Sequence, residues 1–128
     1  MSKSEVFAAA VRSLGHAPRI DSDGDIFFDA DGFSHVLYAT EDDTEFLRLA
    51  IPNVRTLASD TEYWPALQAA NTVNRHMKVA KAYLYDQMVV ISAENLLPTP
   101  DGVYEVLDQL LYYAHAAVTR FHQELQPK

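Results

Sequence analysis

The acidic segment DSDGDIFFDADG, residues 21–32, has the composition of a calcium-binding loop. An EF-hand needs oxygen ligands at positions 1, 3 and 5, glycine at position 6 and a bidentate glutamate at position 12, because the turn and the oxygen cage depend on them. Starting at Asp21 places Ile26 at position 6, and starting at Asp29 places Phe33 at position 5, so the motif fails in both registers. We expect two hairpin turns here, since Asp-Gly pairs favour tight turns.

Other patterns that carry chemistry are missing from the sequence. It has no phosphate-binding glycine motif, no GxSxG elbow around a serine, and no cysteine for thiolate or zinc chemistry. His115 and His122 share a helical stripe but lie about 10 Å apart along the axis, too far to chelate one ion. Acidic pairs such as Asp42 and Asp43 lack the apolar surroundings that tune a catalytic carboxyl. We therefore predict no catalytic residue, no metal site and no cofactor.

The size and charge of the chain limit its class and its partners. With 128 residues, we expect a single domain that spans residues 1–128. Eighteen acidic residues oppose ten lysines and arginines, so the formal charge is −8, and nucleic acid and anionic membrane surfaces would repel the chain. The apolar runs are too short for a signal peptide or a membrane span. The lack of cysteine suits a reducing cytoplasm, where we expect the protein.

The first half of the chain changes from helical to strand spacing. Apolar residues recur at helical intervals over residues 3–14, Ser4 can cap this helix, and Gly15 suits the left-handed position after its end. From Arg19 onwards, short aromatic and β-branched runs alternate with Asp-Gly and EDD turn signals. We predict an antiparallel meander of three or four strands, ended by Pro52 because proline cannot donate to a ladder.

The second half has the pattern of a helix, a hairpin and a long helix. Residues 59–77 return to helical spacing, and two starts are open: a capping box of Ser59 and Glu62, or a first turn that contains Pro65. KVAKAYLYD and MVVISAEN then flank an Asp-Gln turn, and a long apolar stripe follows Pro100. We predict an α+β fold of order α-β-β-β-α-β-β-α, a twisted antiparallel sheet with helices mainly on one face.

The middle helix carries asparagine beside its apolar face. An amide that is buried must find partners for up to four hydrogen bonds. Asn74, with or without Asn71, either satisfies backbone groups at the entry to the next strand or forms part of a binding groove. The residues of this face are Tyr63, Leu67, Ala70, Asn74 and Met77, with Trp64 and Asn71 at its border.

The strands carry more aromatic side chains than one buried face can hold. In KVAKAYLY, residues 79, 81, 83 and 85 share one face, and the smaller Ala80 and Ala82 lie on the other. Tyr38 and Phe46 add aromatic surface on other strands. We expect a second surface that is covered by a partner or another subunit.

Two further stretches are GHAPRIDSDGDIFFDADG and WPALQAANTVNRHMKVAKAYLYDQMVVISAEN, the latter followed by a long amphipathic helix. They resemble the YbjN domain, a family of candidate sensory transduction regulators in bacteria. Trp64, Asn71, Asn74 and Lys81 match the recurring tryptophan, the spaced asparagines and the strand lysine of that family. The resemblance implies a fold similar to that of type III secretion chaperones, which are small, acidic, cytoplasmic and often dimeric, and which bind an extended segment of an effector. It implies no catalytic residues.

The leading hypothesis is a non-enzymatic protein-binding module, a chaperone-like or regulatory adaptor for another polypeptide, with or without a homodimer. The alternative is a small-molecule sensor or an enzyme with a pocket between the middle helix and the sheet. A third possibility is a fold kept for oligomer assembly alone. The predicted partner-binding residues are Tyr38, Phe46, Trp64, Asn71, Asn74, Lys81, Tyr83 and Tyr85.

Overall fold

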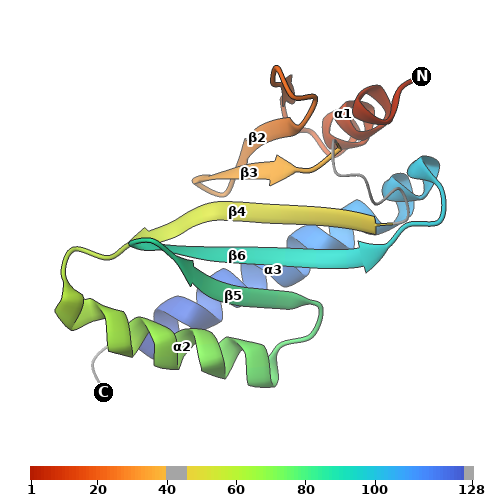
Figure 1. The fold of residues 1–128 in the computed structure, drawn as a ribbon. Coiled ribbons are helices and arrows are strands. Elements are labelled where there is room, and N and C mark those ends of the chain that lie inside the picture. Colours follow the sequence, from red (N-terminus) through yellow and green to blue (C-terminus); the bar gives the residue numbers. More distant parts are fainter. Residues whose placement is uncertain (40–45, 126–128) are drawn as a thin grey trace.

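The computed structural model describes residues 1–39 and 46–125, and the predicted order of elements is confirmed (Figure 1). The meander has four strands, so the larger of the two predicted numbers is correct. The EDD turn signal, with Asp42 and Asp43, lies outside the described residues. The elements are α1 (Lys3–Ser13), β1 (Arg19–Ile20), β2 (Ile26–Ala30), β3 (Phe33–Leu37), β4 (Phe46–Thr56), η1 (Asp60–Glu62), α2 (Tyr63–His76), β5 (Ala80–Tyr85), β6 (Met88–Leu96), η2 (Pro100–Gly102) and α3 (Val103–Leu125).

The six strands form one antiparallel sheet in the order β1-β2-β3-β4-β6-β5, so β6 lies between β4 and β5. Figure 1 shows α3 crossing behind β4, β6 and β5, with α2 along the β5 edge and α1 beside β2. The core lies between the sheet and α3, because Leu47, Leu49 and Ile51 of β4 point to that side with the period of two that a strand imposes. No helix of the described ranges covers the opposite face (Figure 1).

The second hairpin shows how one strand serves both faces of the sheet. Ala80 and Ala82 of β5 are buried in the core, whereas Lys81, Tyr83 and Tyr85 point to the helix-free face and are exposed. The alternation predicted for KVAKAYLY is therefore confirmed. Alanine is the side chain that lets α2 and α3 approach this strand closely, and tyrosine is left facing solvent.

Two local predictions for the first half are wrong. Ser2 is the N-cap of α1, its Oγ accepting from the Glu5 N–H at 3.1 Å, while the Ser4 hydroxyl donates to the Gly24 carbonyl. The predicted role of Gly15 is confirmed by its φ of 91° after the helix end. Strand β4 continues beyond Pro52 to Thr56, because a register shift between Ile51 and Arg55 accommodates the proline.

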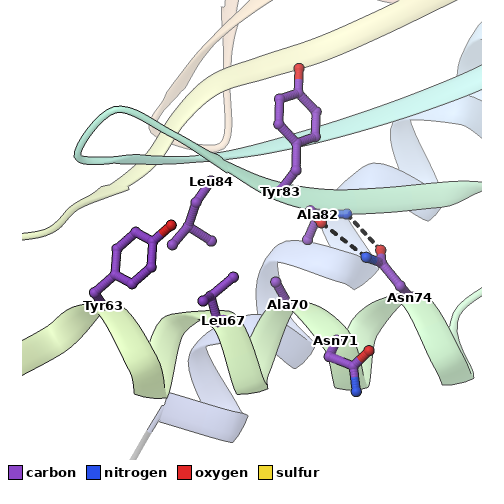
Figure 2. Close-up of a pocket in the computed structure, with 8 residues that line it drawn as sticks. All are labelled: Tyr63, Leu67, Ala70, Asn71, Asn74, Ala82, Tyr83 and Leu84. Atoms are coloured by element: carbon purple, nitrogen blue, oxygen red, sulfur yellow. Dashed lines mark hydrogen bonds between the residues drawn. The ribbon is translucent and has the colours of Figure 1, made fainter.

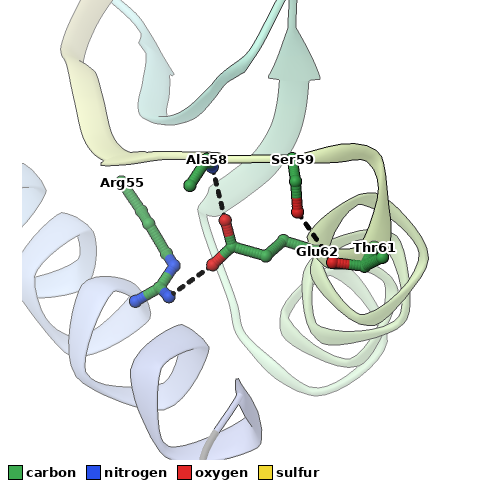
Figure 3. A network of polar contacts seen from close by, with 5 residues as sticks. All are labelled: Arg55, Ala58, Ser59, Thr61 and Glu62. Carbon is green, nitrogen blue, oxygen red and sulfur yellow. Dashed lines mark hydrogen bonds and ion pairs between the residues drawn. The ribbon is translucent and has the colours of Figure 1, made fainter.

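The junction between β4 and α2 is held by Glu62 rather than by the predicted capping box (Figure 3). The Glu62 carboxylate accepts from the Ala58 N–H and, at 2.9 Å, from the Arg55 guanidinium, while the Ser59 hydroxyl pairs with Thr61. The bond from Ala58 and then the Arg55 contact lower the pKa of Glu62. A 3-10 turn precedes α2, so Pro65 lies in the first turn of the helix, as the second possibility predicted.

The aspartate-rich segment forms the two predicted hairpin turns. Asp21 Oδ1 accepts from the N–H groups of Asp23 and Asp25 at 3.0 Å, and Asp31 and Gly32 take the positive φ angles of a two-residue turn, 52° and 83°. Within residues 1–39 and 46–125 no group of three or more histidines and carboxylates could hold a metal ion. Among the same residues no helix is long and apolar enough to cross a membrane.

Val79 joins α2 to β5 in a strained conformation. Its φ is 71°, and the Ala80 N–H donates to the Lys78 carbonyl at 2.7 Å. This is a γ-turn of the rare positive-φ kind, and a β-branched residue is poorly suited to it. The turn reverses the chain within three residues, so β5 returns directly alongside α2.

Replacing Val79 by glycine should raise the free energy of unfolding by about 1 kcal/mol, because relief of the left-handed strain exceeds the added entropy of the unfolded chain. Val79 is 46% exposed, so little packing is lost. Denaturant unfolding measures the change. Val54→Gly, at a buried strand position, is the control and should destabilise; a loss of stability in Val79→Gly would contradict the strain.

Candidate functional site

The helix-free face of the sheet carries an apolar hollow of about 290 Å³. Strands β4 and β6 form its floor, since Ala50 and Val90 are small and buried there. Two predicted residues of β5, Tyr83 and Tyr85, stand on one side of it, and Tyr38, just after β3, stands on the other. Its lining residues are Tyr38, Ala50, Pro52, Tyr83, Tyr85, Met88 and Val90.

Two basic side chains beside this hollow are each paired, one with a carboxylate and the other with an aromatic ring. Lys81 Nζ lies 2.7 Å from Glu94 Oε1 across β5 and β6, and the Arg48 guanidinium lies 4.4 Å from the centre of the Tyr38 ring. The predicted residue Lys81 is therefore paired on the sheet and lies beside the hollow. The hollow therefore has an apolar floor, aromatic walls and a border in which the charged side chains are paired.

A second hollow, an open groove of about 360 Å³, lies between α2 and β5 (Figure 2). Tyr83 lines both hollows, so the two lie next to each other at this residue of β5. The residues that line the groove are Tyr63, Leu67, Ala70, Asn71, Asn74, Ala82, Tyr83 and Leu84.

Asn74 is fully engaged with the backbone of β5. Its Oδ1 accepts from the Ala82 N–H at 2.8 Å, and its Nδ2 donates to the Ala82 carbonyl at 3.0 Å (Figure 2). This pairing with the following strand is the structural alternative predicted for Asn74, although the residue lies at the sheet edge and is exposed rather than buried. Figure 2 shows the Asn71 amide pointing away from β5, and within the described residues it makes no hydrogen bond.

Two other predicted residues lie outside both hollows. Trp64 is 65% exposed at the start of α2, and Phe46 is half-buried at the start of β4. The structure thus gathers Tyr38, Tyr83 and Tyr85 in one hollow and places the two asparagines at the other.

A histidine pair is the polar cluster that the sequence did not reveal. His35 of β3 is buried, and its Nε2 lies 2.8 Å from Nε2 of His115 on α3. The Nδ1 of His35 lies 2.9 Å from the Phe33 carbonyl, and the Nδ1 of His115 lies 2.8 Å from the Asp31 carboxylate. Burial, as the largest effect, lowers the pKa of His35 to about 4.

These contacts assign the protons. A neutral His35 donates from Nδ1 to the Phe33 carbonyl, so its Nε2 accepts from His115. A hollow of about 160 Å³ beside this pair is lined by Asp31, Phe33, His115, Val118 and Thr119. The pair fastens α3 to the β2–β3 hairpin.

The arrangement of strands and helices defines the class of fold: it is the fold shared by type III secretion chaperones and YbjN. No family model matches the chain. No curated protein matches it either.

Three solved structures are similar to it. A chain of the HopA1–SchA chaperone–effector complex has a TM-score of 0.64 and 14% identity, covering 93% of this chain and 91% of that one. YbjN, a candidate transcription regulator from E. coli, has a TM-score of 0.60 and 13% identity, covering 93% and 88%. The Yersinia pestis type III secretion chaperone SycH, solved with a fragment of YscM2, has a TM-score of 0.54 and 15% identity, covering 92% and 98%. The predicted fold is confirmed.

Proposed function

We propose that this chain is a non-enzymatic, chaperone-like protein of the cytoplasm that holds a segment of another polypeptide. Residues 1–128 act in it as one domain, without a cofactor, a nucleic acid or a membrane as partner. The segment lies on the helix-free face of the sheet, between Tyr38 and the pair Tyr83 and Tyr85. The observation that carries the proposal is the apolar hollow on this face, with three tyrosines around a floor of small side chains.

The similar structures support a polypeptide as the occupant. Two of the three are chaperone complexes, one described with its effector and the other with a fragment of YscM2. Tyrosine is also the residue type that gives large contact area at low entropic cost, and it is enriched where proteins bind one another. A regulatory adaptor is the same proposal with a signalling partner in place of a client.

The groove between α2 and β5 gives less support to a small-molecule sensor or an enzyme. Ligand sites are concave and combine apolar walls with a few convergent polar groups. This groove is open, the Asn74 amide is already bonded to Ala82, and the Asn71 amide points away from β5 (Figure 2).

Site-specific crosslinking tests the proposal with a matched pair of tyrosines. A photoreactive phenylalanine at Tyr85, which is 62% exposed beside the hollow, should crosslink a discrete second polypeptide in the native host. The same residue at Tyr112, 70% exposed on α3, is the control and should not. Mass spectrometry identifies the product.

The exposed position of these tyrosines separates binding from folding. Tyr83→Ser, at a 37% exposed position, should change the free energy of unfolding by about 0.5 kcal/mol or less and should abolish the crosslink from residue 85 to the partner. Equal labelling from residues 85 and 112 would contradict the proposal. If the crosslinked product contains only a second copy of the chain, this face is the interface of a homodimer and not the site of a client polypeptide.

A further inference from the structure

The outer edge of β5 has a closed position, where the main-chain N–H and C=O are already hydrogen-bonded, and an open position, where they are not. The two hydrogen bonds of Asn74 show that the N–H and C=O of Ala82 point away from β6, toward α2. In an antiparallel pair, every second residue of a strand turns these groups to the same side. Ala82 pairs with Ile91 and Leu84 with Val89, so Leu84 also directs its N–H and C=O to the outer edge.

The edge groups of Leu84 have no partner among the described residues. Leu84 is half-buried, and its side chain and those of Tyr63 and Leu67 line the groove beside this open position (Figure 2). Most partly or fully buried peptide groups are paired, because an unpaired one loses its hydrogen bonds to water without replacement. An unpaired main-chain donor and acceptor beside an apolar groove can form hydrogen bonds with the main chain of another peptide segment.

We propose that the groove between α2 and β5 receives one extended segment of a polypeptide, whose main chain pairs with Leu84 and whose pairing stops at Asn74. This inference rests on the proposed function, since the segment belongs to the same partner. Tyr83 lines both hollows, so a bound segment passes from the helix-free face, around Tyr83, to the edge of β5. Strand addition of this kind draws affinity from main-chain bonds and selectivity from alternate side chains.

A second copy of the chain fits this edge poorly. Antiparallel pairing of two β5 strands centred on Leu84 would place Ala82 of each copy opposite Asp86 of the other. Asn74 already occupies the edge groups of Ala82, and Asp86 lies in the turn with a φ of 54°. A free peptide has no helix or turn that must fit into the groove, so it can end beside Asn74.

Removing the Asn74 side chain should therefore strengthen binding. Asn74→Ala frees the edge groups of Ala82, and the peptide can then pair at two positions instead of one. We expect its dissociation constant to fall about tenfold, the change expected from one further pair of main-chain hydrogen bonds. If Asn74 only stabilises the fold, Asn74→Ala should bind the peptide more weakly or not at all. Asn71→Ala, on the same helix with its amide away from β5, is the matched control and should bind as the unchanged protein does.

The probe is a peptide selected on the full chain from a phage-displayed library of short, unconstrained peptides. Fluorescence anisotropy gives the dissociation constants, and hydrogen exchange gives the protection of single amides. We expect the Leu84 amide to exchange more slowly in the complex. N-methylation of one set of alternate peptide residues should abolish binding, and methylation of the other set should not. If Asn74→Ala loses its fold, Asn74→Ser, which is too short to bridge to Ala82, takes its place.

The outcomes separate this inference from the proposed function. Unchanged exchange at Leu84, weaker binding by Asn74→Ala, equal effects of the two methylation sets, or a library that yields no binding peptide would each overturn edge pairing. Crosslinking from Tyr85 to a partner would still support the helix-free face as its site. If crosslinking from Tyr85 also fails while a small molecule is retained in the groove, both proposals fall.

Discussion

Replacing Phe28 by alanine should lower the free energy of unfolding by about 3–5 kcal/mol, the cost of removing a large aromatic side chain from a packed core. Phe28 is fully buried on the core side of β2, with its ring 5.0 Å from the His35 ring and 5.5 Å from the His16 ring. The variant loses this packing and leaves a cavity that the His35 ring cannot fill without leaving its hydrogen bonds. Urea unfolding followed by circular dichroism measures the change.

The neighbouring phenylalanine is the control, because it is the same residue type in the same strand but on the opposite face of the sheet. Phe27 lies next in the same strand, is half-buried and points to the helix-free face. Phe27→Ala should cost about 1 kcal/mol, in line with partial burial. A reversed order of the two losses would mean that β2 is shifted by one residue, which would exchange its faces.

Lowering the pH from 7 to 4 should remove about 3 kcal/mol of stability through His35 alone. The ordinary pKa of histidine, 6.5, applies to the unfolded chain, and burial lowers the pKa to about 4 in the folded protein. Between these values the unfolded chain binds the additional proton. The contribution is therefore fully present above pH 6.5 and is lost as the pH falls toward 4. Three ionisable side chains act on His35: His115 and His16 oppose its protonation, and Asp31 favours it.

His35→Gln isolates this effect from the titration of the carboxylates. A glutamine amide can still accept from His115 and donate to the Phe33 carbonyl, but it does not titrate in this range. Stability curves of both proteins between pH 7 and 4 should differ in slope, with the variant losing about 3 kcal/mol less. Parallel curves would show that His35 is charged or solvated in the folded protein.

The succession of elements was predictable because the period of the apolar residues changes clearly along the chain. Spacing of three and four residues at Val6 and Ala10, and again from Val103 to Phe121, predicted helices that the structure contains. Alternation in KVAKAYLY predicted both faces of β5. These patterns arise from neighbours in the chain, so no knowledge of the tertiary structure is needed to see them.

Features that depend on distant contacts were not predictable in this way. His35 and His115 are 80 residues apart, and no local pattern links them. The helical stripe that His115 shares with His122 gave no sign of this pair, and His122 turns its Nδ1 to the Val118 carbonyl of its own helix. Strand β4 was predicted too short, since its continuation past Pro52 depends on the register shift against β6.

The candidate site was predictable in composition and less so in arrangement. Excess aromatic residues on strands indicated a second covered surface, and Tyr38, Tyr83 and Tyr85 line one hollow. Trp64 and Phe46 were chosen on residue type, and both lie outside the two hollows. The spacing of the asparagines gave no sign that Asn74 faces the strand edge and Asn71 faces away, because that difference follows from where α2 docks.

The position of β6 between β4 and β5 has a consequence for how the chain is made. Strand β4 leaves the ribosome well before β6, and α2 and β5 are synthesised between them. Until β6 emerges, one edge of β4, with Leu47, Leu49 and Ile51, is unpaired and prone to join other nascent chains. Pairing of β4 with β6 also closes a long loop, which slows folding. Completion of the sheet is therefore a late step of synthesis.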